Sequence, residues 1–308
     1  MIRLARAWHW APLAVPLVAV IELLAHAFQL ATTASPGQWD AVKPVVESLA
    51  RPADLIVIAP PWADPLGREH LGAQLMTVDR VAPADVTRFP RAVEVSLGGS
   101  ARNEVSHWSV VDKRSVGPFV VRVRNNPNFV PIIDDLLTHV RVGAMSVARV
   151  DGAQSLDCAY SHGSFGSTGF LFGPALPADG FRCASGAPVG ITIMPVLDYT
   201  PRRCLLAEPL GGSSILRIRV PDVAFGRSLQ GHHGVFVDME RTLDGAPVTL
   251  VVRGPHGVLG EVVHHDGNGW KPFELSTDDL SGTRGELVFE VSAASGTNRV
   301  YCFEASTR

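Results

Sequence analysis

The second half of the chain is a succession of short apolar runs, and this pattern restricts the fold more than any other feature of the sequence. The runs recur about every ten residues, and breakers such as Asp266–Gly269 separate them. Short runs at this spacing are typical of the strands of an all-β sandwich. The sequence therefore predicts a jelly-roll-like β-sandwich domain over residues 186–308. Its predicted strands are Val189–Val196, Ile215–Val220, Val235–Met239, Val248–Arg253, Val258–Val263, Trp270–Leu275, Leu287–Val291 and Val300–Phe303.

Residues 36–185 combine helical and strand patterns and predict a small α/β domain. Ser35 and Pro36 have the residue types of a helix start, and apolar residues from Trp39 to Leu49 recur at helical spacing. The apolar run Asp54–Ala59 follows and is typical of a buried strand. The predicted fold class of the whole chain is therefore α+β. Further predicted elements are strands over Leu75–Asp79, Ala92–Leu97, Trp108–Asp112, Phe119–Arg124 and 142–150, and a helix over Pro131–Val140.

Residues 1–35 predict export of the rest of the chain. The stretch from Ala11 to Leu30 is almost wholly apolar, and about twenty such residues in a helix span a bilayer. Arg3 and Arg6 precede this stretch, so the positive-inside rule places the N-terminus in the cytoplasm and the domains outside it. This predicts a single-pass transmembrane anchor in the inner (cytoplasmic) membrane. The alternative is a signal peptide cleaved near Ala25 to Ala27, which gives a secreted or periplasmic protein.

Four cysteines lie in the second half of the chain, and none belongs to a C-x-x-C pair. In an exported chain, four thiols predict two disulfides, for which three connectivities are open. We expect Cys158–Cys183, which encloses a Gly-rich segment. We also expect Cys204–Cys302, which would join the entry and the last strand of the β-sandwich.

The charge balance excludes nucleic acid as the main partner. The chain has 27 Lys and Arg against 30 Asp and Glu, a formal net charge of -3, so no basic excess neutralises phosphates. The neighbouring carboxylates Asp134 and Asp135 lie in a predicted helix, where they point about 100° apart and cannot act together on a glycoside. The sequence contains no convincing catalytic constellation and favours a protein that is not an enzyme.

Several residues of the second half of the chain have side chains of the types that bind metal ions, but their spacing does not favour a metal site. Adjacent histidines in a strand point to opposite faces, so each pair offers one ligand to a shared site, and no metal site is predicted. The oxygen-bearing turn Asp266–Gly269 is the one candidate for calcium, but it lacks a full twelve-residue binding loop. The residues of metal-ligating type that cluster here are His232, His233, His264, His265 and Asp266.

Two groups of residues are candidates for ligand binding. Trp270 and Tyr301 lie in the predicted sandwich and have aromatic faces on which sugars stack. Asp64, Arg68 and His70 follow the buried strand at residues 54–59, and ligands bind at the carboxyl ends of strands in open α/β sheets. The first group favours glycan binding, and a cleft at the second group would favour an enzyme.

Two segments resemble known families. Trp39–Gly72, with DLIVIAPPW and DPLGREHLG, resembles the extracytoplasmic region of bacterial membrane glycosyltransferases of the protein-mannosyltransferase type and of related uncharacterised membrane proteins. That family has its catalytic acid near the start of many membrane helices, so no catalytic residue transfers to this chain. The resemblance implies an envelope protein of glycan-related context. Gly234–Arg308 is similar to jelly-roll modules of the galactose-binding or carbohydrate-binding type.

These features together predict a membrane-anchored extracytoplasmic protein that binds glycan or organises the envelope without catalysis. Its expected partners are the membrane, through the N-terminal helix, and a glycan or an envelope protein. The alternative is an envelope hydrolase or an accessory subunit of a membrane glycosyltransferase.

Overall fold

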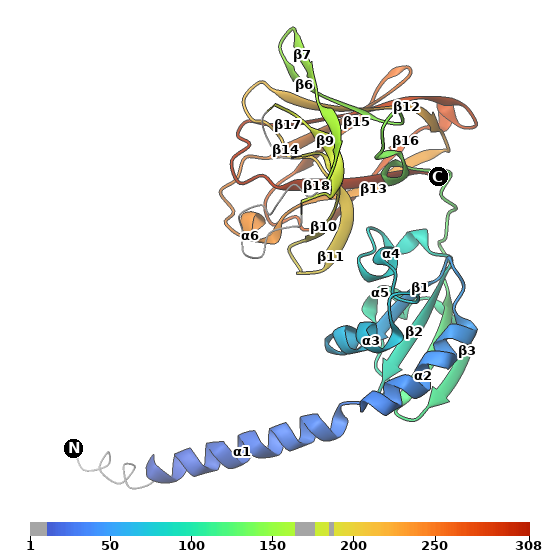
Figure 1. The fold of residues 1–308 in the computed structure, drawn as a ribbon, viewed down its shortest axis with the longest axis vertical. Coiled ribbons are helices and arrows are strands. Elements are labelled where there is room, and N and C mark those ends of the chain that lie inside the picture. The colour runs from blue at the N-terminus through green and yellow to red at the C-terminus, as the bar shows by residue number, and fades with distance from the viewer. Residues whose placement is uncertain (1–10, 164–175, 185–187) are drawn as a thin grey trace, which may run out of the picture. The chain divides into compact units, whose positions relative to one another are not determined.

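The computed structural model describes residues 11–163, 176–184 and 188–308, which form two compact units (Figure 1). The α/β unit contains the chain up to Met76 together with Arg91–Asn125. The sandwich unit contains Thr77–Pro90 and Asn126–Arg308. This division does not coincide with the domain boundary predicted between residues 185 and 186.

The α/β unit is built on a four-stranded sheet. Its helices are α1 (Ala11–Thr32), α2 (Pro36–Leu49), α3 (Asp64–Leu71) and α5 (Asn103–Ser106), with the 3-10 helix η2 (Pro61–Ala63), and its strands are β1 (Leu55–Ala59), β2 (Arg91–Leu97), β3 (Ser109–Val116) and β4 (Phe119–Asn125). The strand order is β1-β2-β4-β3, with β1 and β2 parallel and the other pairs antiparallel. Trp39 of α2 packs on Phe119 at a ring distance of 4.5 Å, and Gly67 lets α3 approach Ile58 of β1. The predicted helix and buried strand of this region are therefore confirmed.

The apolar N-terminal segment forms α1, and its described side chains from Ala14 to Leu24 are exposed. Across the described ranges of the chain, the structure contains no helix with the length and apolarity needed to cross a membrane. The N-terminal membrane helix predicted from the sequence is not confirmed.

The sandwich unit is made almost entirely of strands. Its elements are α4 (Val78–Val81), η3 (Val86–Arg88), β5 (Asp134–Asp135), η4 (Leu136–His139), β6 (Ser146–Asp151), β7 (Gln154–Asp157), β8 (Ala159–His162), β9 (Asp179–Arg182), β10 (Gly190–Pro195), β11 (Pro201–Leu206), β12 (Ile215–Ala224), β13 (Ser228–Val235), α6 (Val237–Glu240), β14 (Val248–Gly254), β15 (Gly257–His264), β16 (Lys271–Ser276), η5 (Asp278–Leu280), β17 (Arg284–Ala293) and β18 (Tyr301–Thr307). The first sheet has the order β10-β11-β18-β13-β16, with β5 paired to β18, and the second has the order β15-β14-β17-β12-β6-β7. All these strand pairs are antiparallel. Phe289 of β17 and Phe303 of β18 meet between the sheets with ring centroids 5.1 Å apart, which confirms the predicted β-sandwich.

Two of the predicted strands, Leu75–Asp79 and Val235–Met239, are not strands in the structure. The segment Leu75–Asp79 turns and enters the short helix α4 instead. The segment Val235–Met239 contains only the last residue of β13 and continues into α6. The apolar residues of both segments are mostly buried, so the pattern reported burial correctly and the backbone conformation wrongly.

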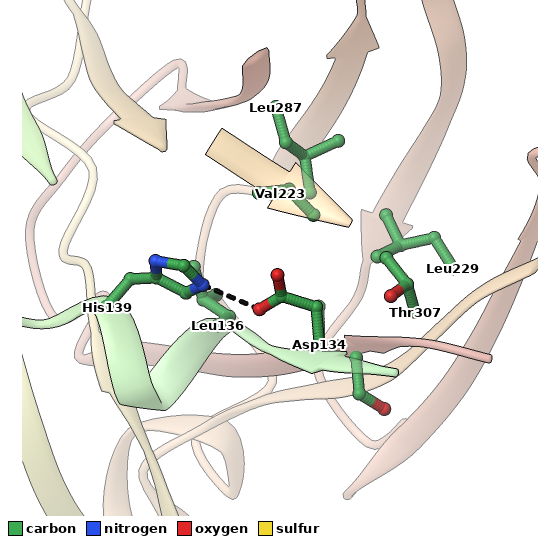
Figure 2. Close-up of a pocket in the computed structure, with 9 residues that line it drawn as sticks. Asp134, Leu136, His139, Val223, Leu229, Leu287 and Thr307 are labelled. Atoms are coloured by element: carbon green, nitrogen blue, oxygen red, sulfur yellow. Dashed lines mark hydrogen bonds and ion pairs between the residues drawn. The ribbon is translucent and has the colours of Figure 1, made fainter. Parts of the chain in front are cut away.

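The helix predicted over Pro131–Val140 is also wrong. Ile133 N donates to Thr307 O at 2.9 Å, so the backbone here joins the first sheet as β5 instead of forming helical hydrogen bonds. The chain then turns through η4, where His139 Nε2 lies 2.6 Å from Asp134 Oδ1 (Figure 2). Pairing with a distant strand has overridden the local helical pattern.

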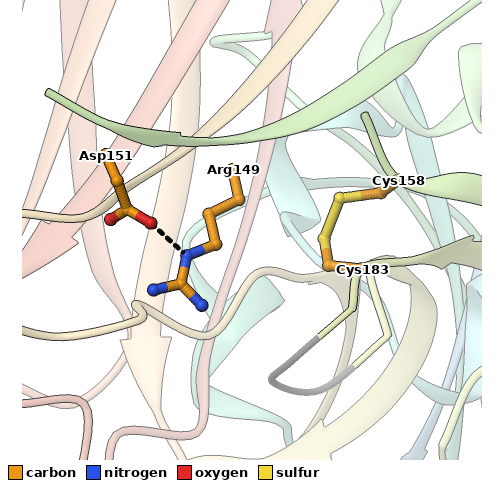
Figure 3. Close-up of a disulfide and its surroundings, with 4 residues drawn as sticks. All are labelled: Arg149, Asp151, Cys158 and Cys183. Atoms are coloured by element: carbon orange, nitrogen blue, oxygen red, sulfur yellow. Dashed lines mark hydrogen bonds and ion pairs between the residues drawn. A yellow bond between two sulfur atoms is a disulfide. The ribbon is translucent and has the colours of Figure 1, made fainter. Parts of the chain in front are cut away.

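Both predicted disulfides are present. Cys158–Cys183 spans 25 residues of sequence and lies near the ion pair of Arg149 and Asp151 (Figure 3). Cys204–Cys302 spans 98 residues and joins the neighbouring strands β11 and β18 of the first sheet. The second disulfide therefore fixes the pairing of two strands that are far apart in the chain.

Candidate functional site

A groove of about 380 Å³ lies on the outer face of the first sheet, within the sandwich unit. Successive residues of β13 point to opposite faces, so Leu229 and His233 are buried while Gln230 and His232 reach the groove. The groove therefore lies between β13, its neighbour β16 and the 77–90 segment. Its lining residues are Asp85, Thr87, Gln230, Gly231, His232, Pro272, Phe273 and Glu274.

The 77–90 segment forms one wall of the groove and is tied to the sheet by side chains. Trp270 Nε1 donates to Ala84 O at 2.7 Å. Arg308 Nη2 pairs with Asp85 at 2.6 Å, and Arg308 Nη1 donates to Thr87 Oγ1 at 3.0 Å. Because Arg308 and Asp85 are both buried, this wall is held in a fixed position.

His232 is oriented by two neighbours. Its Nδ1 lies 2.9 Å from Oε1 of the buried Glu304 on β18, and its ring stacks on Trp270 with centroids 5.9 Å apart and planes 6° apart. Nε2 of His232 has no hydrogen-bond partner among the residues that the structure describes. This nitrogen is the part of the ring that can serve a ligand.

Asp85 is an ionised acceptor at the edge of the groove. Burial by itself would raise the pKa of its carboxyl, but hydrogen bonds from Thr87 and the charges of His232 and Arg308 outweigh burial and lower the pKa below 3.8. The carboxylate accepts hydrogen bonds from Thr87 N at 2.8 Å and from Arg308. Asp85 therefore stays charged at neutral pH.

The remaining lining combines planar polar groups with an apolar floor. Gln230 Nε2 donates to Glu274 Oε1 at 3.1 Å across β13 and β16. Gly231, Pro272 and Phe273 carry no polar side-chain atoms. Amide, carboxylate and imidazole groups around an apolar floor can hydrogen-bond the hydroxyls of a compact ligand and pack against its C–H groups.

The two aromatic residues predicted to bind sugar have different environments in the structure. Trp270 is half-buried, and both its ring and its indole N–H are engaged, with His232 and with Ala84, so it supports the groove. Tyr301 is fully buried in the core, which corrects its predicted role as a sugar-stacking residue. Its side chain points from β18 into the core, where its ring packs near those of His233 and Phe303.

The predicted site at Asp64, Arg68 and His70 lies in the α/β unit on α3. Asp64 and Arg68 form an ion pair with each other. Burial raises the pKa of the Asp64 carboxyl, and the nearby charges of Arg68 and Arg102 only partly offset this. His70 instead stacks on Trp39 at 6.1 Å. The structure thus joins Asp64 with Arg68, and it places His70 against Trp39 and Asp40, with His70 Nδ1 3.5 Å from Asp40 Oδ1.

The metal-ligand candidates do not assemble. His232 faces the groove while His233 lies in the core, with its ring 5.1 Å from that of His264. The described part of the chain contains no group of three His, Cys, Asp or Glu side chains placed to hold a metal ion. Asp266, the calcium candidate, is instead buried in an ion pair with Arg299.

A second cavity beside β5 is too small for a substrate. It encloses about 10 Å³, enough for about one water molecule. Asp134 and His139 bond to each other at its edge (Figure 2), and Asp135 is paired with Arg88. The two carboxylates considered for glycoside chemistry are therefore both engaged in holding the fold.

Sequence reasoning missed most of the groove. Gln230 and Glu274 are polar residues on the outer face of β13 and β16, and alternation with buried Leu229, His233 and Phe273 was the available signal. No local signal connects Asp85 or Thr87 to these strands, because the 77–90 segment precedes them by more than a hundred residues.

Comparison with known proteins finds solved structures that resemble this chain only at low sequence identity and low TM-score. No family model matches the chain, and no curated protein matches it. Among solved structures, the chain is similar to the M60 catalytic domain with two CBM51 domains of Clostridium perfringens ZmpB, at 11% identity and a TM-score of 0.31 over 66% of this chain and 20% of that chain.

Two isolated modules are also similar. A CBM29-2 mutant matches at 10% identity and a TM-score of 0.21, over 40% of this chain and 83% of that chain. The family 11 carbohydrate-binding module of a cellulosomal cellulase of Clostridium thermocellum matches at 11% identity and a TM-score of 0.23, over 65% and 94%. This chain spans only about a fifth of the clostridial M60 protein. The predicted relationship to mannosyltransferase-type proteins is not shown, and at these TM-scores the function rests on the groove itself.

Proposed function

We propose that the protein binds glycan in the groove on the outer face of the first sheet and catalyses no reaction there. The observation that carries this proposal is the groove's composition: planar hydrogen-bonding side chains from Asp85, Gln230, His232 and Glu274 around an apolar floor, in a volume of about 380 Å³. That volume lies within the range of small-molecule sites, which runs from about 300 to 1,000 Å³. It is large enough for one or two sugar rings.

The electrostatics of Asp85 support binding without glycoside hydrolysis. A glycosidase needs one carboxylic acid whose raised pKa lets it donate a proton to the leaving group. The pKa of Asp85 is lowered instead, chiefly because hydrogen bonds from Thr87 and the charges of His232 and Arg308 outweigh burial. Asp85 is thus a charged part of the groove wall and not a proton donor to a leaving group.

Titration of the full chain with solubilised cell-wall and exopolysaccharide fractions tests the proposal. The double variant Gln230→Ala/Glu274→Ala should weaken binding at least about tenfold, because each lost hydrogen bond contributes about 1 kcal/mol or more. Glu261→Ala, an exposed glutamate on β15 of the second sheet, is the matched control and should bind normally. Binding that survives the double variant, or no binding to any fraction, contradicts the proposal.

We also propose that the domains are exported and that the apolar residues of α1 direct this export. Two disulfides support an oxidising compartment outside the cytoplasm. Thiol alkylation of the native protein, followed by cell fractionation and N-terminal sequencing, tests this. Protected thiols outside the cytoplasm are expected, in a form that either keeps residues 11–32 as a membrane anchor or has lost them to signal cleavage. Four alkylated cysteines in a cytoplasmic fraction would contradict export.

A further inference from the structure

We propose that the groove selects amino sugars that carry a free ammonium group, and that the Glu274 carboxylate is the group that selects them. This inference rests on the proposed glycan binding and names the class of sugar. Among the described charged side chains around the groove, most are paired with a basic or acidic side chain, and one is not.

Among its described lining residues, the groove offers a ligand no unpaired cation, because the imidazole of His232 already faces the buried Glu304 at 2.9 Å. Its described lining contains neither lysine nor arginine. The guanidinium of Arg308, behind the wall at Asp85 and Thr87, is buried and already engaged with Asp85, with Thr87 Oγ1 at 3.0 Å and with Ser306 Oγ at 3.3 Å. A sugar carboxylate or phosphate would therefore enter the groove without a counter-charge, which makes acidic glycans poor ligands.

Two of the nearby carboxylates are also satisfied. Asp85 accepts from Arg308 Nη2 at 2.6 Å and from Thr87 N at 2.8 Å. Glu304 lies beneath His232, is buried, and is engaged by His232 Nδ1 at 2.9 Å. These two carboxylates therefore shape the groove without offering a ligand an unpaired charge.

Glu274 differs from both. It is exposed on the outer face of β16, and its Oε1 accepts from Gln230 Nε2 at 3.1 Å. Its Oε2 has no hydrogen-bond partner in the described part of the chain. The bond from Gln230 fixes the carboxylate at the groove without neutralising it, so Oε2 is free to accept an N–H from an ammonium group.

A hexosamine satisfies these conditions together. Its ring presents C–H groups that can pack on Pro272 and on the backbone of Gly231, and its hydroxyls can pair with His232 and Gln230. The ammonium group at carbon 2 supplies the positive charge that the groove lacks. N-acetylation would remove that charge while keeping the ring, so the acetylated sugar isolates the contribution of Glu274.

Calorimetry with two matched pairs of oligosaccharides tests the inference on the full chain. The probes are tetramers of β-1,4-glucosamine and of α-1,4-galactosamine, each with its fully N-acetylated counterpart, at about pH 6, where amines of this kind are protonated. At least one amine tetramer should bind about threefold to tenfold more tightly than its acetylated form. The preference should shrink as salt rises from about 50 to 500 mM, since the ion pair is partly exposed to solvent.

Two conservative variants make the result specific. Glu274→Gln should abolish the preference for the amine over the acetylated tetramer, because the amide carries no negative charge to pair with the ammonium group. Glu261→Gln on β15 is the matched control and should keep the preference. Equal affinity within both pairs, tighter binding of the acetylated forms, or a preference that survives Glu274→Gln overturns the inference and leaves the proposed function standing.

The remaining outcomes separate the inference from the proposed function. If neither pair binds but a neutral or acidic polysaccharide fraction does, and binding to it depends on Gln230 and Glu274, the inference is wrong and glycan binding holds. If no tetramer and no fraction binds, both are wrong.

Discussion

Glu208 shows how one buried side chain contributes to the pH response of the sandwich unit. It follows β11, and burial raises the pKa of its carboxyl from 4.5 to about 7. The folded protein therefore holds a proton on Glu208 at pH values at which the unfolded chain has released it. The contribution of Glu208 to the free energy of unfolding is then fully present below about pH 4.5, falls as the pH rises toward about 7, and is lost above that value.

Glu208→Gln should remove this loss. We expect the variant to stabilise the sandwich unit by about 1–2 kcal/mol at about pH 8 and to have little effect at about pH 4. The expected gain in the free energy of unfolding is smaller than the pKa change alone would give, because Glu208 is partly exposed to solvent. Urea denaturation at the two pH values measures the difference, with Glu261→Gln as the control on an exposed glutamate. An equal effect at both pH values would mean that burial of Glu208 is not the cause.

Among the elements, the 77–90 segment is held to the end of β18 by a buried ion pair. Arg308→Met removes the guanidinium that pairs with the buried Asp85 and leaves a carboxylate without its counter-charge. We expect a loss of about 3 kcal/mol or more, because breaking a buried ion pair from one side exposes the desolvation penalty of the other. Hydrogen exchange should show faster exchange at Thr87 N, which Asp85 now holds.

The double variant Asp85→Asn/Arg308→Met provides the check on this prediction. It removes the charge that Arg308→Met leaves unpaired, so it should recover part of the lost stability. A double variant that is as unstable as the sum of the two single variants would show that the pair is not coupled.

The sequence predicts most strands of the sandwich unit, but it does not predict that the 77–90 segment packs against them. Most sandwich strands were predicted because their apolar runs and turns are local in the chain. The contacts that build the groove are not local: Trp270 and Ala84 are 186 residues apart, and Arg308 and Asp85 are 223 apart. The sequence predicts Trp270 as a sugar-binding aromatic, yet its ring stacks on His232, a contact that no periodicity indicates.

At the scale of the whole molecule, the disulfides stabilise one unit only. All four cysteines lie in the sandwich unit, since Cys158 is the first of them and this unit begins its second segment at Asn126. In the chain-entropy model, Cys158–Cys183 contributes about 3–4 kcal/mol and Cys204–Cys302 about 4–5 kcal/mol. The α/β unit has its own core around Trp39 and Phe119 and contains no cysteine.

Thermal unfolding should therefore show two transitions that respond differently to reductant. We expect reduction to lower the melting temperature of the sandwich unit by ten degrees or more, roughly, and to leave that of the α/β unit unchanged. Calorimetry with and without dithiothreitol measures this, and the Cys204→Ala/Cys302→Ala variant should reproduce most of the shift. A single transition that moves as a whole would show that the two units unfold together.

The path of the chain also bears on how such a protein can change over generations. The backbone leaves the α/β unit after Met76, contributes Thr77–Pro90 to the sandwich unit, and returns at Arg91. A gene fragment for residues 126–308 would encode both sheets but not Asp85 and Thr87, which line the groove. Recombination at one breakpoint therefore cannot transfer the sandwich with its groove intact, and the two units are expected to be inherited as one block.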